Sequence, residues 1–330
     1  MKTQIAPVRT SAQRTDAVEA AVYLLTGGYP VALPTETVYG LAAWALNPNS
    51  VMRIFQAKER PKNDPLIVHL PRLDWLTNLC VIQDEEWDLV EKLIEKFWPG
   101  PLTLVLPRNK IVPDLVTAGL PTVAVRMSAQ PIFKEIIEGF GQPLAAPSAN
   151  RFGRISPTTA AHVHEELKDR IHLIVDDGPC HIGMESTIVM PSKGTLWVMR
   201  DGAVTREQLA EFGDVRTQPR SHVPNSPGQL KSHYAPRTPV TLLPIDAVPE
   251  ADPQERVGLL AWCSEPESHD FAHVEVLSHA GDSHEAAATL FAKLRILDSR
   301  GLNRIVIESV AEEGLGIAIM DRLRKASGNG

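Results

Sequence analysis

The sequence predicts an α/β protein with a large amino-terminal domain and a smaller carboxy-terminal α/β domain. Short apolar runs typical of buried strands alternate with amphipathic helical segments along most of the chain. A polar, proline-rich stretch over residues 214–239 separates a long first part from a short second part. We therefore expect a catalytic domain over residues 1–213, a linker over 214–239 and a small domain over 240–330.

Helical segments in the first part have recognisable starts and ends. Residues 15–25 form an amphipathic segment that is closed by two glycines, and residues 85–97 place apolar side chains on one face before a Trp-Pro-Gly-Pro turn. Asn47, Pro48 and Ser50 predict the start of a short helix over residues 51–57. Two more helices are expected at 131–138 and 205–211.

The predicted strands of the first part carry polar residues at their ends. The expected strands are residues 30–33, 66–69, 102–106, 122–126, 143–146, 173–175, 185–189 and 198–200. The second part alternates in the same way, with strands at 240–243, 257–261, 274–277 and 304–307 and helices at 283–297 and 315–325.

Composition excludes several function classes. The net charge of −7 argues against a surface that attracts nucleic acid over its whole area, so an anion site must be local. The three cysteines are far apart, which argues against a structural zinc site and indicates a reducing compartment. No apolar run reaches membrane length, and the first residues lack a signal-peptide core. We expect a cytoplasmic protein.

Polar groups recur where predicted strands and helices end. Thr35 and Thr37 follow the first buried strand, one on either side of Glu36, and Lys58 and Arg60 leave a helix two residues apart. A lysine suits phosphate as a point charge, whereas an arginine grips two oxygens, although cations at a helix end are also common on surfaces. Further members of this set are Arg126, Ser148, Asn150, Ser186 and Arg200.

Such strand-end groups typically build one ligand crevice in an α/β sheet. Four cations with several small hydroxyl and amide donors predict a site for a polyphosphate and a small polar substrate. The chain has no Walker-type glycine loop and no His/Cys cluster with metal-ligand spacing.

Four motifs together resemble the YrdC-like family. They are PTETVYGL at residues 34–41, KER-P-x-x-DPL at 58–66, the Ser148-Ala149-Asn150 turn and Glu185-Ser186-Thr187. The resemblance covers residues 15–212 and is closest to the threonylcarbamoyl-AMP synthases of that family. It implies a twisted mixed sheet with helices for the first domain.

The linker and the second part resemble the longer, two-domain members of this family. His233, Tyr234, Ala235 and Pro236 match their His-Tyr-Ala-Pro linker, and Gly-Leu-Gly-x-Ala-Ile from Gly314 matches their carboxy-terminal signature. The family implies a Rossmann-like second domain and a linker that folds over the active site. We accordingly expect Tyr234→Ala to lower activity while leaving the melting temperature nearly unchanged.

The resemblance implies a nucleotidyltransferase of tRNA threonylcarbamoyladenosine modification. L-threonine and bicarbonate form a carbamate that attacks the α-phosphorus of ATP, which gives L-threonylcarbamoyl-AMP and pyrophosphate. Mg²⁺ is expected with ATP, and a downstream tRNA-modification transferase complex and weak RNA binding are expected as partners.

By matching motifs, Lys58, Arg60 and Tyr234 are expected to be catalytic. ATP is expected at Lys58, Arg60, Asp64, Thr122, Ser148, Asn150, Ser156 and Arg200. L-threonine is expected at Thr37, His69, Arg126, Ala146 and Ser186.

One position departs from the family pattern. The family usually has asparagine before the proline of this loop, and here Asp64 precedes Pro65. An aspartate repels phosphates unless a metal ion or the ribose interacts with its carboxylate.

Two other function classes remain open. One is a stand-alone RNA-binding module, which the net negative charge of the chain disfavours. The other is a carbamoyl-transfer maturation enzyme, which should carry Cys-x-x-Cys zinc modules that are absent from this sequence.

Overall fold

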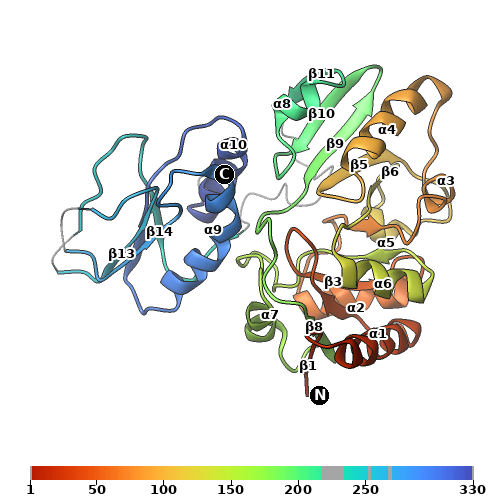
Figure 1. Cartoon of the computed structure of the whole chain (residues 1–330), viewed down its shortest axis with the longest axis horizontal. Coiled ribbons are helices and arrows are strands. Elements are labelled where there is room, and N and C mark those ends of the chain that lie inside the picture. Colours follow the sequence, from red (N-terminus) through yellow and green to blue (C-terminus); the bar gives the residue numbers. More distant parts are fainter. Residues whose placement is uncertain (1, 218–233, 252–253, 267–269, 329–330) are drawn as a thin grey trace. The chain divides into compact units, whose positions relative to one another are not determined.

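The computed structural model describes residues 2–217, 234–251, 254–266 and 270–328. These residues form two compact bodies (Figure 1). The first body comprises Met1–Phe152, Pro157–His181 and Glu185–Gln229, and the second comprises Gly153–Ser156, Ile182–Met184 and Leu230–Gly330. None of the described helices is long and apolar enough to cross a membrane.

The first body contains an 11-stranded mixed sheet among its described residues, with the order β1-β8-β2-β3-β7-β4-β6-β5-β9-β10-β11. Parallel and antiparallel neighbours alternate irregularly; β4 and β6 are parallel, for example, whereas β5 and β6 are antiparallel. The strands are β1 Gln4–Pro7, β2 Val31–Leu33, β3 Gly40–Trp44, β4 Ile67–His69, β5 Leu102–Pro107, β6 Thr122–Arg126, β7 Leu144–Ala145, β8 Leu173–Asp176, β9 Thr187–Ser192, β10 Thr195–Arg200 and β11 Asp214–Thr217. The predicted mixed α/β architecture is confirmed.

Side-chain caps mark the start of α1, α2, α7 and α8 in this body. In α1, Thr10 and Gln13 form a reciprocal capping box, which starts the helix at Ser11. In α2, the Asn47 side chain accepts from two backbone N–H groups, and Glu59 in the left-handed region ends the helix just after Lys58. The helices are α1 Ser11–Thr26, α2 Pro48–Lys58, α3 Trp75–Leu79, α4 Asp84–Phe97, α5 Asp114–Thr117, α6 Pro131–Phe140, α7 Ala160–Leu167 and α8 Arg206–Ala210.

Two cores lie on opposite faces of this sheet. The larger core joins the sheet to helices α2, α4 and α7, and Val68, Val123 and Val125 belong to it. The second core joins α1 and α6 to the half of the sheet that contains β2, β3, β7 and β8. Helices α1 and α6 pack against each other, and α4 runs beside β9 (Figure 1).

The second body has a smaller four-stranded sheet with the order β12-β15-β13-β14, and all of its pairs are parallel. Its elements are β12 Val240–Leu242, β13 Val257–Ala261, β14 His273–Val276, α9 Ser283–Asp298, β15 Arg304–Ile307 and α10 Leu315–Ala326. Helices α9 and α10 pack against each other (Figure 1). The second α/β unit is therefore confirmed, whereas its Rossmann-like character stays a prediction.

Three strands were not expected from the sequence. β1 is a short edge strand, β3 consists largely of glycine and alanine, and β11 is polar and lies within the stretch that we expected to be linker. Glycine and alanine have low strand propensity, and polar edge strands lack the apolar signal. The description of the chain stops at Thr217 and resumes at Tyr234, so the predicted domain boundaries stay predictions.

Candidate active site

One face of the first sheet carries a small apolar cluster made only of strand residues. Its buried members are Ile67, Val105, Ala124, Ile188 and Met199. Because side chains alternate along a strand, residues two positions away project to the same side. This places Thr103, Thr122, Arg126 and His69 on the face that carries the cluster. Several predicted site residues therefore surround one small apolar centre.

Arg126 ends β6 and is held by three protein groups. Its Nε donates to the carbonyl oxygen of Gly100 at 3.0 Å, and its Nη1 donates to the Thr37 hydroxyl at 3.1 Å. Its Nη2 lies 2.6 Å from Glu36 Oε1 in a buried ion pair. A guanidinium has five N–H groups, so two of them keep no acceptor among the described residues. These two donors can bind a substrate carboxylate.

Glu36 was not predicted as a site residue. Its side chain is buried, and its second carboxylate oxygen accepts from the Ser128 hydroxyl, which in turn accepts from the Gln130 N–H at 3.3 Å. Burial alone would raise the pKa of Glu36, but the charge of Arg126 and the hydrogen bonds from Ser128 and Arg126 hold the pKa below its usual value. Glu36 is therefore an anion.

His69 lies beside Arg126 because β4 and β6 pair in parallel with these two residues in register. Its ring packs on Phe133 of α6, with centroids 4.8 Å apart. Burial, together with the positive charge of Arg126, lowers the pKa of His69 to about 3. Its buried Nδ1 has no hydrogen-bond partner among the described residues. His69 is a neutral imidazole that can bind a small polar group.

Ser186 and Arg200 are in direct contact. Arg200 donates through Nε and Nη2 to the carbonyl oxygen of Ser186 and through Nη2 to its hydroxyl, at 3.0–3.1 Å. The Ser186 hydroxyl also lies 2.8 Å from that of Thr103. The sequence assigned Ser186 to threonine and Arg200 to ATP, so the structure brings one residue of each set together.

Lys58 braces the Ser-Ala-Asn turn. Its buried Nζ donates to the carbonyl oxygens of Ser148 and Asn150, at 2.5 Å each. Burial, reinforced by the nearby charge of Arg60, lowers the pKa of Lys58 well below its ordinary value. An ammonium group has three N–H donors, so Lys58 shapes this turn and retains one donor.

Arg60 and Asp64 form a buried ion pair with a separation of 2.8 Å. Arg60 also donates to the carbonyl oxygen of Pro65 at 2.9 Å. Asp64 is therefore the ion-pair partner of Arg60, and the contact of either residue with a nucleotide stays a prediction. The pair precedes β4, and Thr122 begins the parallel neighbour β6.

The predicted residues consequently gather at two ends of neighbouring strands. β7 runs antiparallel to β4, so the Ser148–Asn150 turn lies toward the amino-terminal end of β4, near Arg60 and Asp64. His69 and Arg126 lie at the carboxyl ends. Ala146 is between, with its N–H donating to the carbonyl oxygen of Ile67 at 3.0 Å. The predicted nucleotide set, apart from Arg200 and Ser156, is thus at one end, and the predicted threonine set, apart from Ala146, is at the other.

Ser156 and Tyr234 belong to the second body. Ser156 is fully buried, and its neighbour Ile155 accepts from the Arg295 guanidinium through its carbonyl oxygen. Tyr234 is buried, stacks on Phe291 with centroids 5.5 Å apart, and lies under the Arg322 guanidinium at 5.2 Å. Tyr234 is therefore packed in an aromatic core. From the sequence alone, a tyrosine in such a linker is usually a packing anchor, and this packing agrees with that interpretation; the lid role implied by the family resemblance stays a prediction.

Tyr39 is a further residue that the sequence interpretation left without a role. Its carbonyl oxygen accepts from the Ala149 N–H at 2.7 Å, and its own N–H donates to the carbonyl oxygen of Pro157 at 2.9 Å. Its hydroxyl donates to the carbonyl oxygen of Gly178 at 2.7 Å. The backbone of Tyr39 thus helps to hold the Ser148–Asn150 turn in place. The sequence signal that could have indicated this role is its position in the PTETVYGL motif.

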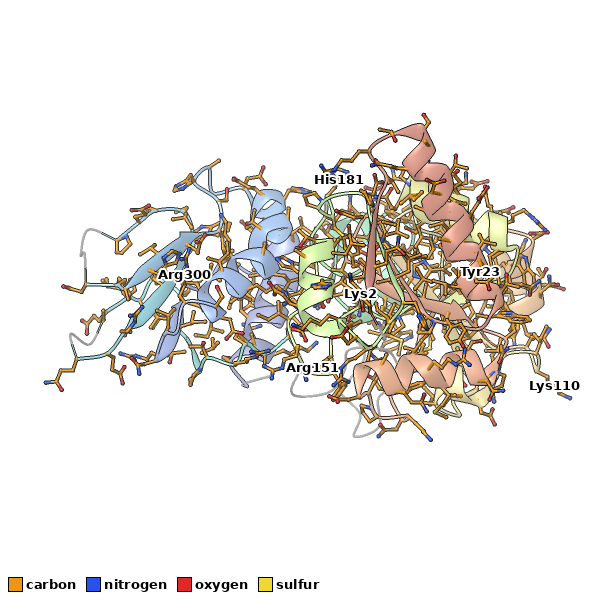
Figure 2. All side chains as sticks on the ribbon, turned by 90° about the horizontal axis from the view of Figure 1, so that it is seen from below. Lys2, Tyr23, Lys110, Arg151, His181 and Arg300 are labelled. Atoms are coloured by element: carbon orange, nitrogen blue, oxygen red, sulfur yellow. The ribbon has the colours of Figure 1, made fainter. Side chains whose placement is uncertain are left out.

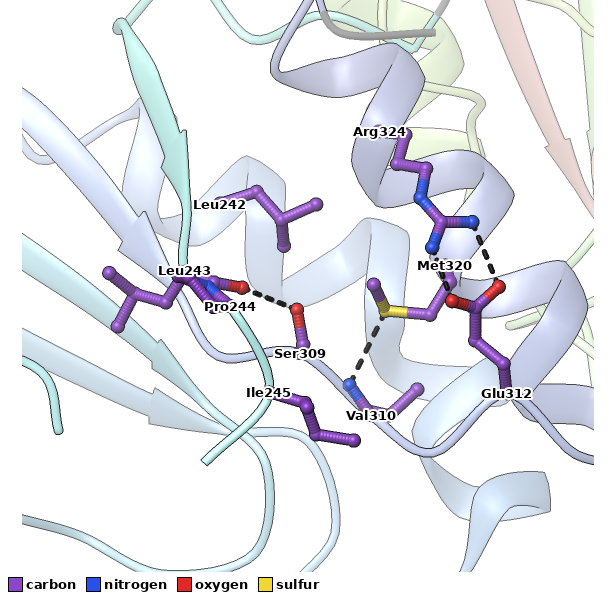
Figure 3. A pocket seen from close by; sticks show the side chains of 9 residues that line it. All are labelled: Leu242, Leu243, Pro244, Ile245, Ser309, Val310, Glu312, Met320 and Arg324. Atoms are coloured by element: carbon purple, nitrogen blue, oxygen red, sulfur yellow. Dashed lines mark hydrogen bonds and ion pairs between the residues drawn. The ribbon is translucent and has the colours of Figure 1, made fainter. Parts of the chain in front are cut away.

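Two other features do not compete as catalytic centres. No group of three His, Cys, Asp or Glu side chains within the described ranges could hold a metal ion. A hollow of about 470 Å³ in the second body is lined by Leu242, Ile245, Met320 and an Arg324–Glu312 ion pair (Figure 3). The two charged groups that line this hollow, Arg324 and Glu312, pair with each other. Exposed large apolar side chains are normal on protein surfaces, and Tyr23 of the first body, labelled in Figure 2, is 78% exposed.

Comparison with known proteins covers nearly the whole chain. Residues 23–202 match a family model described as telomere recombination, and residues 204–328 match one described as the threonylcarbamoyl-AMP synthase C-terminal domain. The threonylcarbamoyl-AMP synthase of Pyrococcus abyssi is 40% identical over 328 residues, with 94% of each chain covered. The enzyme of that name from Bacillus subtilis is 37% identical over 330 residues, with 94% of this chain and 93% of the relative covered.

A solved structure agrees with these matches. The crystal structure of P. abyssi Sua5 complexed with L-threonine superposes with a TM-score of 0.89 at 37% identity, and the match covers 99% of this chain and 98% of that one. Both family models, the full-length relatives and the shared fold lead to one assignment. The chain belongs to the two-domain threonylcarbamoyl-AMP synthase family.

Proposed function

We propose that the buried donors around β4 and β6 carry out the reaction of this family. The chain is an L-threonylcarbamoyladenylate synthase, which forms L-threonylcarbamoyl-AMP from L-threonine, bicarbonate and ATP and releases pyrophosphate. Its product serves tRNA threonylcarbamoyladenosine modification. The observation that carries the site assignment is the gathering of predicted threonine and nucleotide residues at opposite ends of two paired strands.

The reaction has two bond-forming steps. The neutral amine of threonine attacks the carbon of bicarbonate, and loss of water leaves a carbamate. A carbamate oxygen then attacks the α-phosphorus of ATP, and pyrophosphate leaves with the electrons of the broken P–O bond. The carbamate is short-lived in water, so holding both substrates close together matters more than covalent catalysis.

Threonine is proposed to bind at the carboxyl ends of β4 and β6. The two N–H groups that Arg126 keeps can hold its carboxylate, with Ala146 beside it. Thr37, the neutral His69 and Ser186 surround the remaining polar atoms of the amino acid. A carboxylate fixed in this way leaves the amine facing the nucleotide end.

ATP is proposed to bind at the other end, where Lys58, Arg60, Asp64, Thr122, Ser148 and Asn150 lie, with Arg200 and Ser156 as further contacts. Lys58 retains one N–H and holds the Ser148–Asn150 turn in shape. Positive charge near the phosphates stabilises the charge that develops as pyrophosphate leaves. Lys58 and Arg60 are therefore the proposed catalytic cations.

Mg²⁺ is proposed to arrive with ATP. In such sites Mg²⁺ is usually held by substrate phosphates and one or two carboxylates, which fits a described chain without a three-ligand cluster. Asp64 is engaged by Arg60, so the phosphates would supply most ligands. The ion would neutralise charge on the phosphates.

Tyr234 is proposed to anchor the linker that closes the site, which makes its catalytic role indirect. Residues 218–233, which include His233, lie outside the described residues. A tethered segment that excludes water would protect the carbamate, because a tether keeps its effective concentration high. We further propose a cytoplasmic location, delivery of the product to a tRNA-modification transferase complex, and weak RNA binding.

The direct test is pyrophosphate release from ATP by the purified full chain. Release should require both L-threonine and bicarbonate, and omission of either should reduce it to the background of ATP hydrolysis. Detection of threonylcarbamoyl-AMP in the same samples identifies the product. Equal release without threonine would show that the chain hydrolyses ATP and would contradict the proposal.

A further inference from the structure

The charges around Arg126 balance within one small part of the first body. Arg126 carries +1, and Glu36 carries −1 at 2.6 Å from it. The charges that act on His69 come from these same two residues, and His69 itself is neutral. Thr37 and Ser128 contribute neutral hydroxyls. The Arg126–Glu36 pair therefore has a net formal charge of zero, and the remaining positive charge at this end belongs to Arg200, which donates to Ser186.

Orienting Arg126 does not by itself explain a buried carboxylate here. The carbonyl oxygen of Gly100 and the hydroxyl of Thr37 already fix Nε and Nη1. Gly100 leaves no room for a side chain, because a Cβ on it would lie 2.4 Å from the carbonyl oxygen of Phe97. Burying an anion carries a desolvation cost that a neutral acceptor would avoid. The distinctive contribution of the Glu36 carboxylate is thus its negative charge.

Negative charge matters because the amino acid binds as a zwitterion. A lone buried Arg126 would favour any anion with a carboxylate, including analogues without an amino group. With Glu36 beside it, a second net charge of either sign is disfavoured, since the pocket is buried and weakly screened. A molecule with one carboxylate and one ammonium group matches this pair.

We propose that Glu36 is a specificity-determining residue, which cancels the charge of Arg126 at the threonine carboxylate and so selects a zwitterionic amino acid over an anion or a cation of the same shape. This rests on the proposed function, because it takes Arg126 as the receptor for the threonine carboxylate. Ser128 supports Glu36 through its hydroxyl.

The first test uses the unmodified full chain and isothermal titration calorimetry. The ligands are L-threonine, 2,3-dihydroxybutyrate, in which a hydroxyl replaces the amine, and threoninol, in which a hydroxymethyl group replaces the carboxylate. Threonine should bind at least about tenfold more tightly than either singly charged analogue. Binding of the anion as tightly as threonine would overturn the proposal, even if pyrophosphate release depends on threonine.

The second test separates charge from structure with Glu36→Gln, which keeps the shape of the side chain. The ratio of the threonine affinity to the anion affinity should fall about tenfold in this variant, because the pocket becomes cationic. Glu36→Asp should restore the ratio toward that of the unmodified chain. The matched control is Glu135→Gln, which removes a carboxylate that pairs with Arg14 on the surface of the same body.

A purely structural role for Glu36 predicts a different result. Both ligands would then lose affinity equally, the ratio would stay constant, and the proposal would be overturned. Melting curves of each variant establish that it is folded. If Glu36→Gln does not fold, the three-ligand series on the unmodified chain decides the question. Threonine-dependent pyrophosphate release is recorded separately, so a failure of the proposed function is distinguished from a failure of this inference.

Discussion

Arg126 in the first body and Arg322 in the second form similar ion pairs in different surroundings. Both side chains are buried, and each lies 2.6 Å from a carboxylate oxygen. Arg126 takes its partners from distant polar loops, whereas Arg322 pairs with its sequence neighbour Asp321, which also binds Lys325 at 2.8 Å. The Arg322 guanidinium lies over an aromatic ring.

This difference teaches that a buried ion pair is not by itself a sign of a site. Within the described part of the chain, Arg126 keeps two N–H donors and adjoins a buried imidazole whose Nδ1 has no hydrogen-bond partner, so polar groups remain for a ligand. Arg322 is packed against Tyr234, which stacks on Phe291, so its surroundings are those of a structural core. The predictions below separate the two roles.

The largest expected effect concerns the second region. Tyr234→Ala removes a buried ring from between Phe291 and Arg322 and should lower the free energy of unfolding by about 3 kcal/mol or more. This corrects the sequence-based expectation of an unchanged melting temperature. Urea denaturation of the full chain measures it, with Tyr234→Phe as the control that keeps the ring. If Tyr234→Ala leaves the free energy of unfolding unchanged, Arg322 does not belong to a structural core. The proposed difference between Arg126 and Arg322 would then be wrong.

Next in size is the loss of the nucleotide cations in the first region. Lys58→Ala and Arg60→Ala should each cost about 2–4 kcal/mol of transition-state stabilisation, seen as a fall in kcat/KM for ATP. The unfolding free energy must be measured beside it for Arg60→Ala, because that change removes the ion pair of buried Asp64. Near-normal turnover in both folded variants would take these residues out of the site.

The third prediction follows from the neutral His69. Its pKa of about 3 in the folded state lies below the unfolded value of about 6.5, so the unfolded chain binds the extra proton between these values. Stability should therefore fall as pH falls through this window, and by about 2 kcal/mol from this group between pH 7 and pH 5. His69→Gln should lose this part of the pH dependence. An identical pH slope in the two proteins would argue that His69 is accessible and charged.

Sequence reasoning reached most of the elements because they depend on local signals. The end of α2 at Lys58 and the buried strand at Val31–Leu33 could be read from caps and apolar runs. The sheet order could not, since β1 pairs with β8 across most of the first body. The capping box of Thr10 and Gln13 extended α1 four residues upstream of the predicted start.

The candidate site was predicted where a motif contains the residue, and missed where partners come from elsewhere. Thr37 and His69 lie in or next to recognisable motifs, whereas the role of Glu36 depends on Ser128 and Arg126, about ninety residues away in the chain. Likewise, Gly153–Ser156 follows the Ser-Ala-Asn turn directly but packs in the second body, where Ala235 donates its N–H to the carbonyl oxygen of Gly153 at 2.9 Å. No local pattern encodes such contacts.

The most direct test of the contrast compares Arg126→Lys with Arg322→Lys for threonine binding by isothermal titration calorimetry. Both changes keep the charge and remove the planar fork, so only the surroundings differ. We expect Arg126→Lys to weaken threonine binding about tenfold, roughly 1.4 kcal/mol, with ATP binding changed less than about twofold. Arg322→Lys should leave threonine affinity unchanged and lower the unfolding free energy instead. If Arg322→Lys weakens threonine binding as much as Arg126→Lys does, Arg126 is not the threonine receptor and the account fails.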